Sequence, residues 1–141
     1  MTDQLGVLKD YIVYLCKAKD QHSVHSPFVY HLLTNCIFKQ TKQSSTADYK
    51  KAIKHFLSLQ NITFYEGTPN SKNLSEAYKN KLICCFFISD IHREKAQNKV
   101  WEKIISDKNI QISIDCWSFG LIFTKKDQEK EHFILIKRPW R

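Results

Sequence analysis

Glycine is scarce in this chain, which has three glycines (Gly6, Gly67, Gly120) among 141 residues. No two of them are close enough to form a GxG turn. Such a turn is what lets a backbone approach a phosphate or nucleotide closely, because glycine alone has no side chain in the way. The sequence therefore lacks the glycine-rich loop of a typical nucleotide-binding fold.

Long hydrophobic runs and paired cysteine motifs are also missing. No apolar run approaches the roughly 20 residues of a transmembrane helix, so no membrane span is predicted. The first residues, MTDQLGVLKD, contain no apolar signal segment, and the expected compartment is the cytoplasm. The five cysteines form no CxxC, and a disulfide framework is not expected there.

Positive charge exceeds negative charge, with 22 Lys and Arg against 14 Asp and Glu and a net charge of +8. This balance is compatible with nucleic acid as a partner. The lysines are spread along the chain rather than clustered, which is typical of an ordinary solvated surface. The charge thus supports a nucleic-acid partner only weakly.

The most informative stretch is LICCFFISDIH, from Leu82 to His92. An unbroken apolar run from Leu82 to Ile88 predicts a strand buried on both faces. Neighbouring Cys84 and Cys85 then point to opposite faces. Ligands of open α/β sheets gather just beyond such strand ends, so Asp90 and His92 are the first candidate site residues.

Hydrophobic spacing and capping residues predict the other elements. Helices are expected over 5–19, from Ser26-Pro27 onward, from Ser45 or Thr46 onward, over 71–81, and from Ala96 to Lys108-Asn109. Strands are expected over 62–65, 110–114 (with one face wet), 119–123 and 132–136. The polar KKDQEK would join the last two as an antiparallel hairpin.

This order predicts a single α/β domain over residues 1–141, with a helical segment over 1–44 and an α/β core over 45–141. We expect the strand 82–88 to be the most buried, with strands 110–114 and 132–136 on either side of it. Trp101 should pack its helix onto that strand.

Asp90 and His92 have two interpretations. In the functional interpretation they would act as a base and its orienting acid, or as a remnant metal site. In the structural interpretation Asp90 would cap the following helix and His92 would lie in its first turn. Asp115 ends a strand just before Trp117, and would contact a substrate or only form the turn. Trp140 and Arg141 would stack on a base or pack on the domain itself.

A metal site is not predicted. His22 and His25 have an HxxH spacing and would need Cys16 or His31, plus a further ligand, to hold zinc. Two ligands do not define such a site, and a loop pinned by one buried histidine is the favoured interpretation.

Two separate stretches resemble one family. His25-Ser26-Pro27-Phe28-Val29 is similar to an N-terminal motif of bacterial class I S-adenosylmethionine-dependent methyltransferases. The later stretch resembles the end of the same proteins through ISDIH (88–92), VWEKI (100–104), IDC (114–116), GLIF (120–123) and KEHF (130–133).

The resemblance implies a truncated Rossmann-like mixed sheet whose last two strands pair antiparallel, S-adenosylmethionine as cofactor, and catalysis near Asp90 and His92. Between Phe38 and Leu82 nothing corresponds to the family's cofactor loop or to its ribose-binding acid. NITFYEG (61–67) resembles a later strand, which indicates an internal deletion. The family has two aspartates before Ile-His, where this chain has Ser89 and Asp90.

We therefore expect a shortened methyltransferase-family protein with weak or no activity alone. A partner chain could supply the family's missing half and restore a site around Asp90 and His92, and a homo-oligomer is the other candidate assembly. The alternative is a non-catalytic basic module that binds another subunit or RNA, and a third interpretation is a deletion remnant without a selected role.

Overall fold

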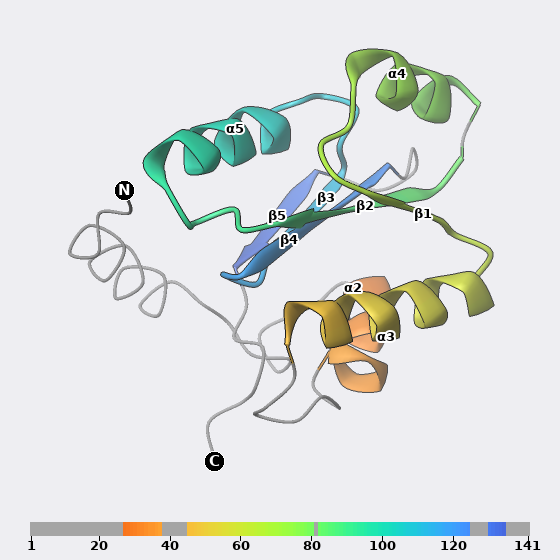
Figure 1. Cartoon of the computed structure of the whole chain (residues 1–141). Helices are drawn as coiled ribbons and strands as arrows, with labels where there is room; N and C mark the ends of the chain where they lie inside the picture. Colours follow the sequence, from red (N-terminus) through yellow and green to blue (C-terminus); the bar gives the residue numbers. More distant parts are fainter. Residues whose placement is uncertain (1–26, 38–44, 81, 125–129, 135–141) are drawn as a thin grey trace.

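The computed structural model describes residues 27–37, 45–80, 82–124 and 130–134 (Figure 1). Its helices are α2 (Pro27–Asn35), α3 (Thr46–Leu59), α4 (Ser71–Lys79) and α5 (Lys95–Ile105). Its strands are β1 (Thr63–Glu66), β2 (Cys84–Ser89), β3 (Ile112–Asp115), β4 (Phe119–Thr124) and β5 (Glu131–Ile134). The helix expected over 5–19, His22, His25, Trp140 and Arg141 all lie outside the described residues.

The strands form one mixed sheet in the order β1-β2-β4-β3-β5. β1 pairs parallel with β2, and β3 pairs parallel with β5. β4 lies between β2 and β3 and is antiparallel to both. Four strands therefore run in one direction and β4 opposes them, which confirms an α/β fold with a mixed sheet.

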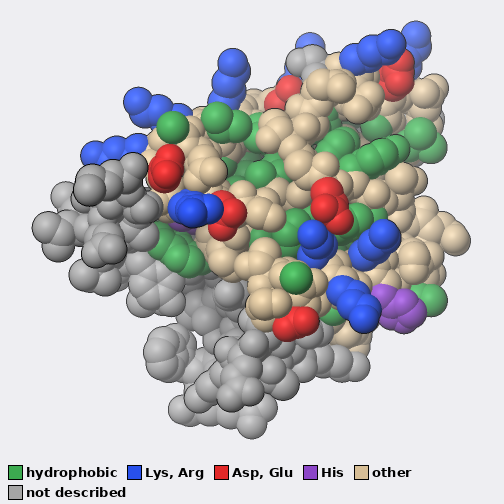
Figure 2. All heavy atoms as spheres, viewed as in Figure 1, with side chains coloured by type: hydrophobic (Ala, Val, Ile, Leu, Met, Phe, Trp, Pro, Cys, Tyr) green, Lys and Arg blue, Asp and Glu red, His purple; other side chains and the backbone are tan. Residues whose placement is uncertain are grey.

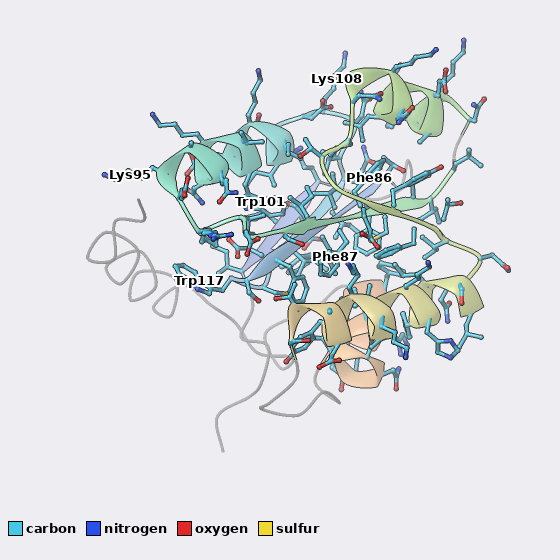
Figure 3. All side chains as sticks on the ribbon, in the orientation of Figure 1. Phe86, Phe87, Lys95, Trp101, Lys108 and Trp117 are labelled. Atoms are coloured by element: carbon cyan, nitrogen blue, oxygen red, sulfur yellow. The ribbon has the colours of Figure 1, made fainter. Side chains whose placement is uncertain are left out.

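Helices cover both faces of this sheet, α2 and α3 on one and α4 and α5 on the other (Figure 1). The alternation of side chains along β2 divides its residues between the two layers. Cys85 and Phe87 join the core with α2 and α3, while Cys84 and Phe86 join the core with α4 and α5, as Figure 3 shows for the two phenylalanines. The opposite orientation expected for the two cysteines is confirmed.

Local sequence explains where the helices begin. α2 begins at Pro27, which suits the first helical position because its missing N–H would have no partner there. Ser45 caps α3: its hydroxyl accepts from the Asp48 N–H, and the Asp48 carboxylate accepts from the Ser45 N–H. These bonds also lower the pKa of Asp48, since they favour its ionised form.

The expected strand order is wrong. β2 is flanked by β1 and β4, and not by the strands near 112 and 132. β4 does not form a hairpin with β5, because β5 adds to the far side of β3 in the parallel direction. An antiparallel pair at this end of the sheet is present, but it joins β3 to β4.

The burial expected for individual strands also needs correction. β4 is buried along its whole length because its side chains enter the cores on both faces of the sheet, whereas Leu82, before β2, is 54% exposed. β3 has no wet face. Its polar Ser113 and Asp115 are each 3% exposed, nearly as buried as Ile112 and Ile114.

Trp101 of α5 is 2% exposed and shares a core cluster with Cys84, Phe86 and Ile88 of β2, the strand that it is expected to cover. Its ring lies directly over Gly120 of β4, where a Cβ would come within 2.5 Å of Trp101 Cη2 and Cζ3. Glycine is therefore required here to let α5 approach the sheet. α5 itself ends at Ile105 and not near Lys108, and its Val100 is exposed.

Candidate functional site

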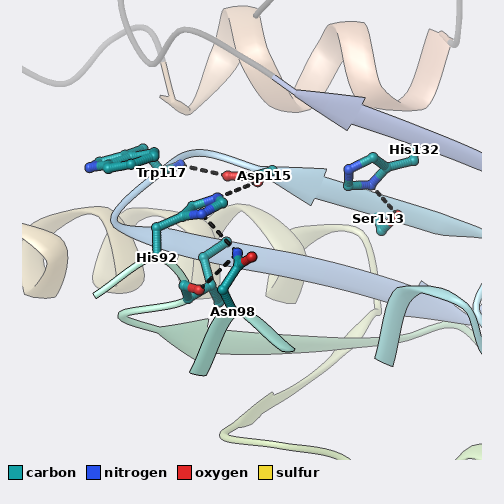
Figure 4. Close-up of polar contacts among 7 residues, drawn as sticks. His92, Asn98, Ser113, Asp115, Trp117 and His132 are labelled. Atoms are coloured by element: carbon teal, nitrogen blue, oxygen red, sulfur yellow. Dashed lines mark hydrogen bonds and ion pairs between the residues drawn. The ribbon is translucent and has the colours of Figure 1, made fainter. Parts of the chain in front are cut away.

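The carboxyl ends of β2 and β3 meet at one edge of the sheet, because the two strands run in the same direction on either side of β4. Asp90 and His92 follow β2, and Asp115 is the last residue of β3. The fold thus brings together residues more than twenty positions apart in the sequence. The candidate site is the group formed by His92, Asn98, Asp115 and Trp117 (Figure 4).

His92 is held by a partner on each ring nitrogen. Its Nε2 lies 2.5 Å from Asp115 Oδ2, and its Nδ1 lies 2.9 Å from the amide nitrogen of Asn98. A carboxylate only accepts, so Nε2 carries the proton, and an amide nitrogen only donates, so Nδ1 accepts. These two contacts are those of an imidazole that donates from Nε2 and accepts at Nδ1.

Asp115 uses both carboxylate oxygens inside the protein. Oδ2 accepts from His92, and Oδ1 accepts from the backbone N–H of Trp117 at 2.9 Å. The carboxylate is 5% exposed, whereas the His92 side chain is 16% exposed. A buried carboxylate needs such donors, because an unpaired buried charge is strongly destabilising.

Trp117 covers the imidazole. Its indole lies nearly parallel to the His92 ring, with an interplanar angle of 9° and 4.5 Å between ring centroids. Asn98 comes from the first turn of α5 and also donates to the Ile91 carbonyl at 3.4 Å. The imidazole is thus fixed by contacts from β3, from α5 and from the turn after β3.

Asp90 does not have the position expected for either interpretation. Its carboxylate is exposed and pairs with Arg93 at 3.9 Å, while the acid bound to His92 is Asp115. The N-cap of α5 is Glu94, so Asp90 does not cap that helix and His92 precedes its first turn. The Arg93 N–H bonds to the Asp90 carbonyl at 3.1 Å, which forms a turn between Asp90 and the start of α5.

Trp117 of the site and its neighbour Asp90 have left-handed backbone conformations, with φ 67° and φ 60°. Aspartate tolerates this region, but it is rare for a bulky residue such as tryptophan. The Asp90 N–H donates to the Ser118 carbonyl at 2.9 Å, which ties the two turns together. Strained backbone of this kind is concentrated at functional sites.

A second polar pair lies on the same face. The Ser113 hydroxyl is 2.7 Å from His132 Nδ1, and these residues are register partners of β3 and β5 (Figure 4). Desolvation of the His132 ring lowers its pKa although the residue as a whole is exposed, and Lys130 and His92 act in the same direction while Asp115 opposes them. The Trp101 ring lies 6.3 Å away between centroids.

Sequence reasoning missed Asn98, Trp117 and the Ser113–His132 pair. The alternation Ser113, Ile114, Asp115 places the two polar residues on one face of β3, but alternation by itself predicts that this face meets solvent. The sequence has no comparable signal for Asn98, because its contact depends on where α5 begins.

No cluster of three or more potential metal ligands occurs among residues 27–37, 45–80, 82–124 and 130–134. In that same part of the chain, no helix is both long and apolar enough to cross a membrane. His31, the described member of the HxxH hypothesis, is exposed, and its ring lies 3.4 Å from the Asn35 amide.

The chain was compared with protein-family models, curated proteins and solved structures, and none of them matches it.

Proposed function

We propose that this chain is a shortened member of the class I S-adenosylmethionine-dependent methyltransferase family, with weak or no methyl transfer when alone. The observation that carries the proposal is the contact between His92 and Asp115. His92 belongs to ISDIH and Asp115 to IDC, two of the stretches that resemble the family. Motifs separated in sequence that converge on one buried hydrogen bond support common descent more strongly than either motif does.

The sheet supports a Rossmann-like assignment. Its strands are parallel except for β4, and the site lies at their carboxyl ends. That edge is where ligands of open α/β sheets bind.

The chemistry available at His92 is limited by its hydrogen bonds. A general base needs a ring nitrogen within reach of the substrate proton, and both nitrogens are engaged by Asp115 and Asn98. Trp117 covers one face of the ring as well. In this arrangement His92 joins the turn after β2 to the end of β3 and does not offer a lone pair to a substrate.

The described residues also do not fit S-adenosylmethionine. Cofactor affinity in such folds depends on a close glycine turn and on an acid directed at the ribose. Gly67, after β1, has φ 91°, but a Cβ added to it would meet no other atom within 4 Å, so it forms no close cradle. Asp115 has both oxygens committed within the protein.

Isothermal titration of the purified chain with S-adenosylmethionine and S-adenosylhomocysteine tests the proposal. We expect no saturable heat at ligand concentrations up to roughly a hundred micromolar, because the contacts present must still offset the roughly 4–15 kcal/mol cost of association. A low-micromolar dissociation constant that Asp90→Ala abolishes would overturn it. The chain would then be a minimal methyltransferase.

A basic binding module is the second candidate, favoured by the outer sides of α4 and α5. Exposed lysines line these two helices on one face of the sheet, and Figure 3 labels Lys95 at the start of α5 and Lys108 beyond its end. The described members are Lys72, Lys79, Lys95, Lys99, Lys103 and Lys108. Filter binding to single-stranded RNA at several salt concentrations tests it, since phosphate contacts give affinity that falls steeply with salt.

A further inference from the structure

β1 is an edge strand of the sheet in the described part of the chain. Edge strands of soluble proteins are commonly protected by lysine, proline or a bulge, which prevent pairing with another chain. Thr63–Glu66 contains neither lysine nor proline, and its register with β2 is continuous over all four residues. Its four-residue length and the charge of Glu66 limit pairing at this edge, but no lysine, proline or bulge within the strand blocks it.

Apolar side chains are exposed around the same strand. Three large hydrophobic residues stand out there: Leu59 at the end of α3 is 67% exposed, Tyr65 of β1 is 44% exposed and Leu82 before β2 is 54% exposed. Figure 1 views the sheet with β1 nearest the reader, and Figure 2 shows hydrophobic side chains across the middle of this side, with lysines above and below them.

The backbone N–H and C=O groups of successive β1 residues point alternately toward β2 and toward the open edge of the sheet. The Gly67 N–H donates to the Phe87 carbonyl of β2 at 2.8 Å. Tyr65, two residues before Gly67, therefore also directs its N–H and C=O groups toward β2. Phe64 and Glu66 direct theirs toward the open edge. These groups form a ready template for another strand.

We infer that a second copy of this chain pairs with this edge, β1 against β1 in the antiparallel direction, with the two Tyr65 residues facing each other across the two-fold axis. The inference is independent of the proposed function. In this register Phe64 lies opposite Glu66 of the other copy, so the outward-directed groups of both strands pair. The two sheets become one continuous ten-stranded sheet, twice the five strands of one copy.

Self-complementarity selects a second copy over a foreign strand. Tyr65 already stacks on Phe86, with 5.0 Å between ring centroids, and the Tyr65 of the other copy would extend this aromatic cluster. Lys50 of α3 pairs with Glu66 at 3.4 Å on the other face of the edge. The two-fold axis would place one such ion pair from each copy beside the interface. Because Glu66 lies opposite Phe64 of the other copy, the two Glu66 carboxylates would not face each other directly.

Sedimentation velocity of the full chain at increasing concentration tests the inference. We expect a monomer–dimer equilibrium that Tyr65→Lys shifts toward monomer by at least about tenfold in dissociation constant, because two lysines would then face each other directly. Val100→Lys is the matched control, since Val100 is 48% exposed on α5 and away from β1. This variant should leave the monomer–dimer equilibrium unchanged. Added salt should strengthen the dimer, because it screens the repulsion between two copies that each carry a net charge of +8.

A second variant does not depend on how well the lysine is tolerated. In the proposed register the two Tyr65 residues form a non-hydrogen-bonded antiparallel pair. The Cα atoms of such a pair are about 4.5 Å apart, a distance that a disulfide can span. Tyr65→Cys should form a disulfide-linked dimer on mild oxidation, whereas wild type and Val100→Cys should not. A monomer at all concentrations overturns the inference, as does a dimer that resists Tyr65→Lys and does not cross-link through residue 65.

Discussion

The Nε2–H of His92 donates to Asp115 Oδ2 at 2.5 Å and joins the turn after β2 to the last residue of β3. The strand between them, β4, runs the opposite way, so this bond links the two parallel strands across it. Because Asp115 is buried and accepts from both His92 and the Trp117 backbone, the bond should contribute to stability whatever the site binds.

Asp115→Asn should destabilise the fold by about 1–3 kcal/mol, because an amide has one acceptor oxygen for two donors and leaves one of them unsatisfied. Urea denaturation measures this. Asp90→Asn is the control, since Asp90 is exposed, its pairing with Arg93 is a surface ion pair, and asparagine tolerates its φ of 60°. A change for Asp90→Asn as large as that for Asp115→Asn would contradict the assignment of Asp115 as the buried partner.

Trp101→Ala should cost about 3–5 kcal/mol, the usual range for removing an aromatic side chain from a core. The control is its neighbour Val100→Ala, an exposed position where the effect should stay within about 0.5 kcal/mol. An unchanged denaturation midpoint for Trp101→Ala would mean that the residue does not pack α5 onto the sheet.

Gly120→Ala should destabilise by about 1–3 kcal/mol, because its Cβ would come within 2.5 Å of the Trp101 ring and force α5 or β4 to shift. The cost should shrink in a Trp101→Phe background, where a smaller ring makes room. Additive effects in the double-mutant cycle would show that the two residues do not touch.

Stability should fall as the pH drops below about 6.5, in part through His132. Its pKa is lowered from 6.5 in the folded state, mainly by desolvation of its ring, so between the two values the unfolded chain binds a proton that the folded chain does not. The contribution is fully present above the unfolded pKa and is lost as the pH falls toward the folded pKa. Thermal melting between about pH 8 and pH 5 measures it.

His132→Gln should flatten this pH dependence, whereas His55→Gln, at an exposed position of α3, should leave it unchanged. Equal slopes for wild type and His132→Gln would exclude His132 as the group responsible.

The sequence alone determined the local elements. The apolar run from Leu82 to Ile88 predicts a buried strand because aromatic and apolar residues without a polar alternation fit a strand covered on both faces. Ser45 and Pro27 predict helix starts because capping depends on residues within one turn. The placement of Trp101 in the core follows from helical spacing.

Only the tertiary structure decided the strand order and the partners at the site. Strand pairing joins segments distant in sequence, and the same apolar pattern in β4 fits an edge hairpin or the middle of the sheet equally well. The insertion of β4 between β2 and β3 set the distance between His92 and Asp115, and it placed Ser113 and Asp115 under α5 instead of in water. The sequence predicts Asp90 beside His92 because the two are near neighbours along the chain. The turn at Asp90 directs its side chain to solvent, and a carboxylate from another strand binds the imidazole.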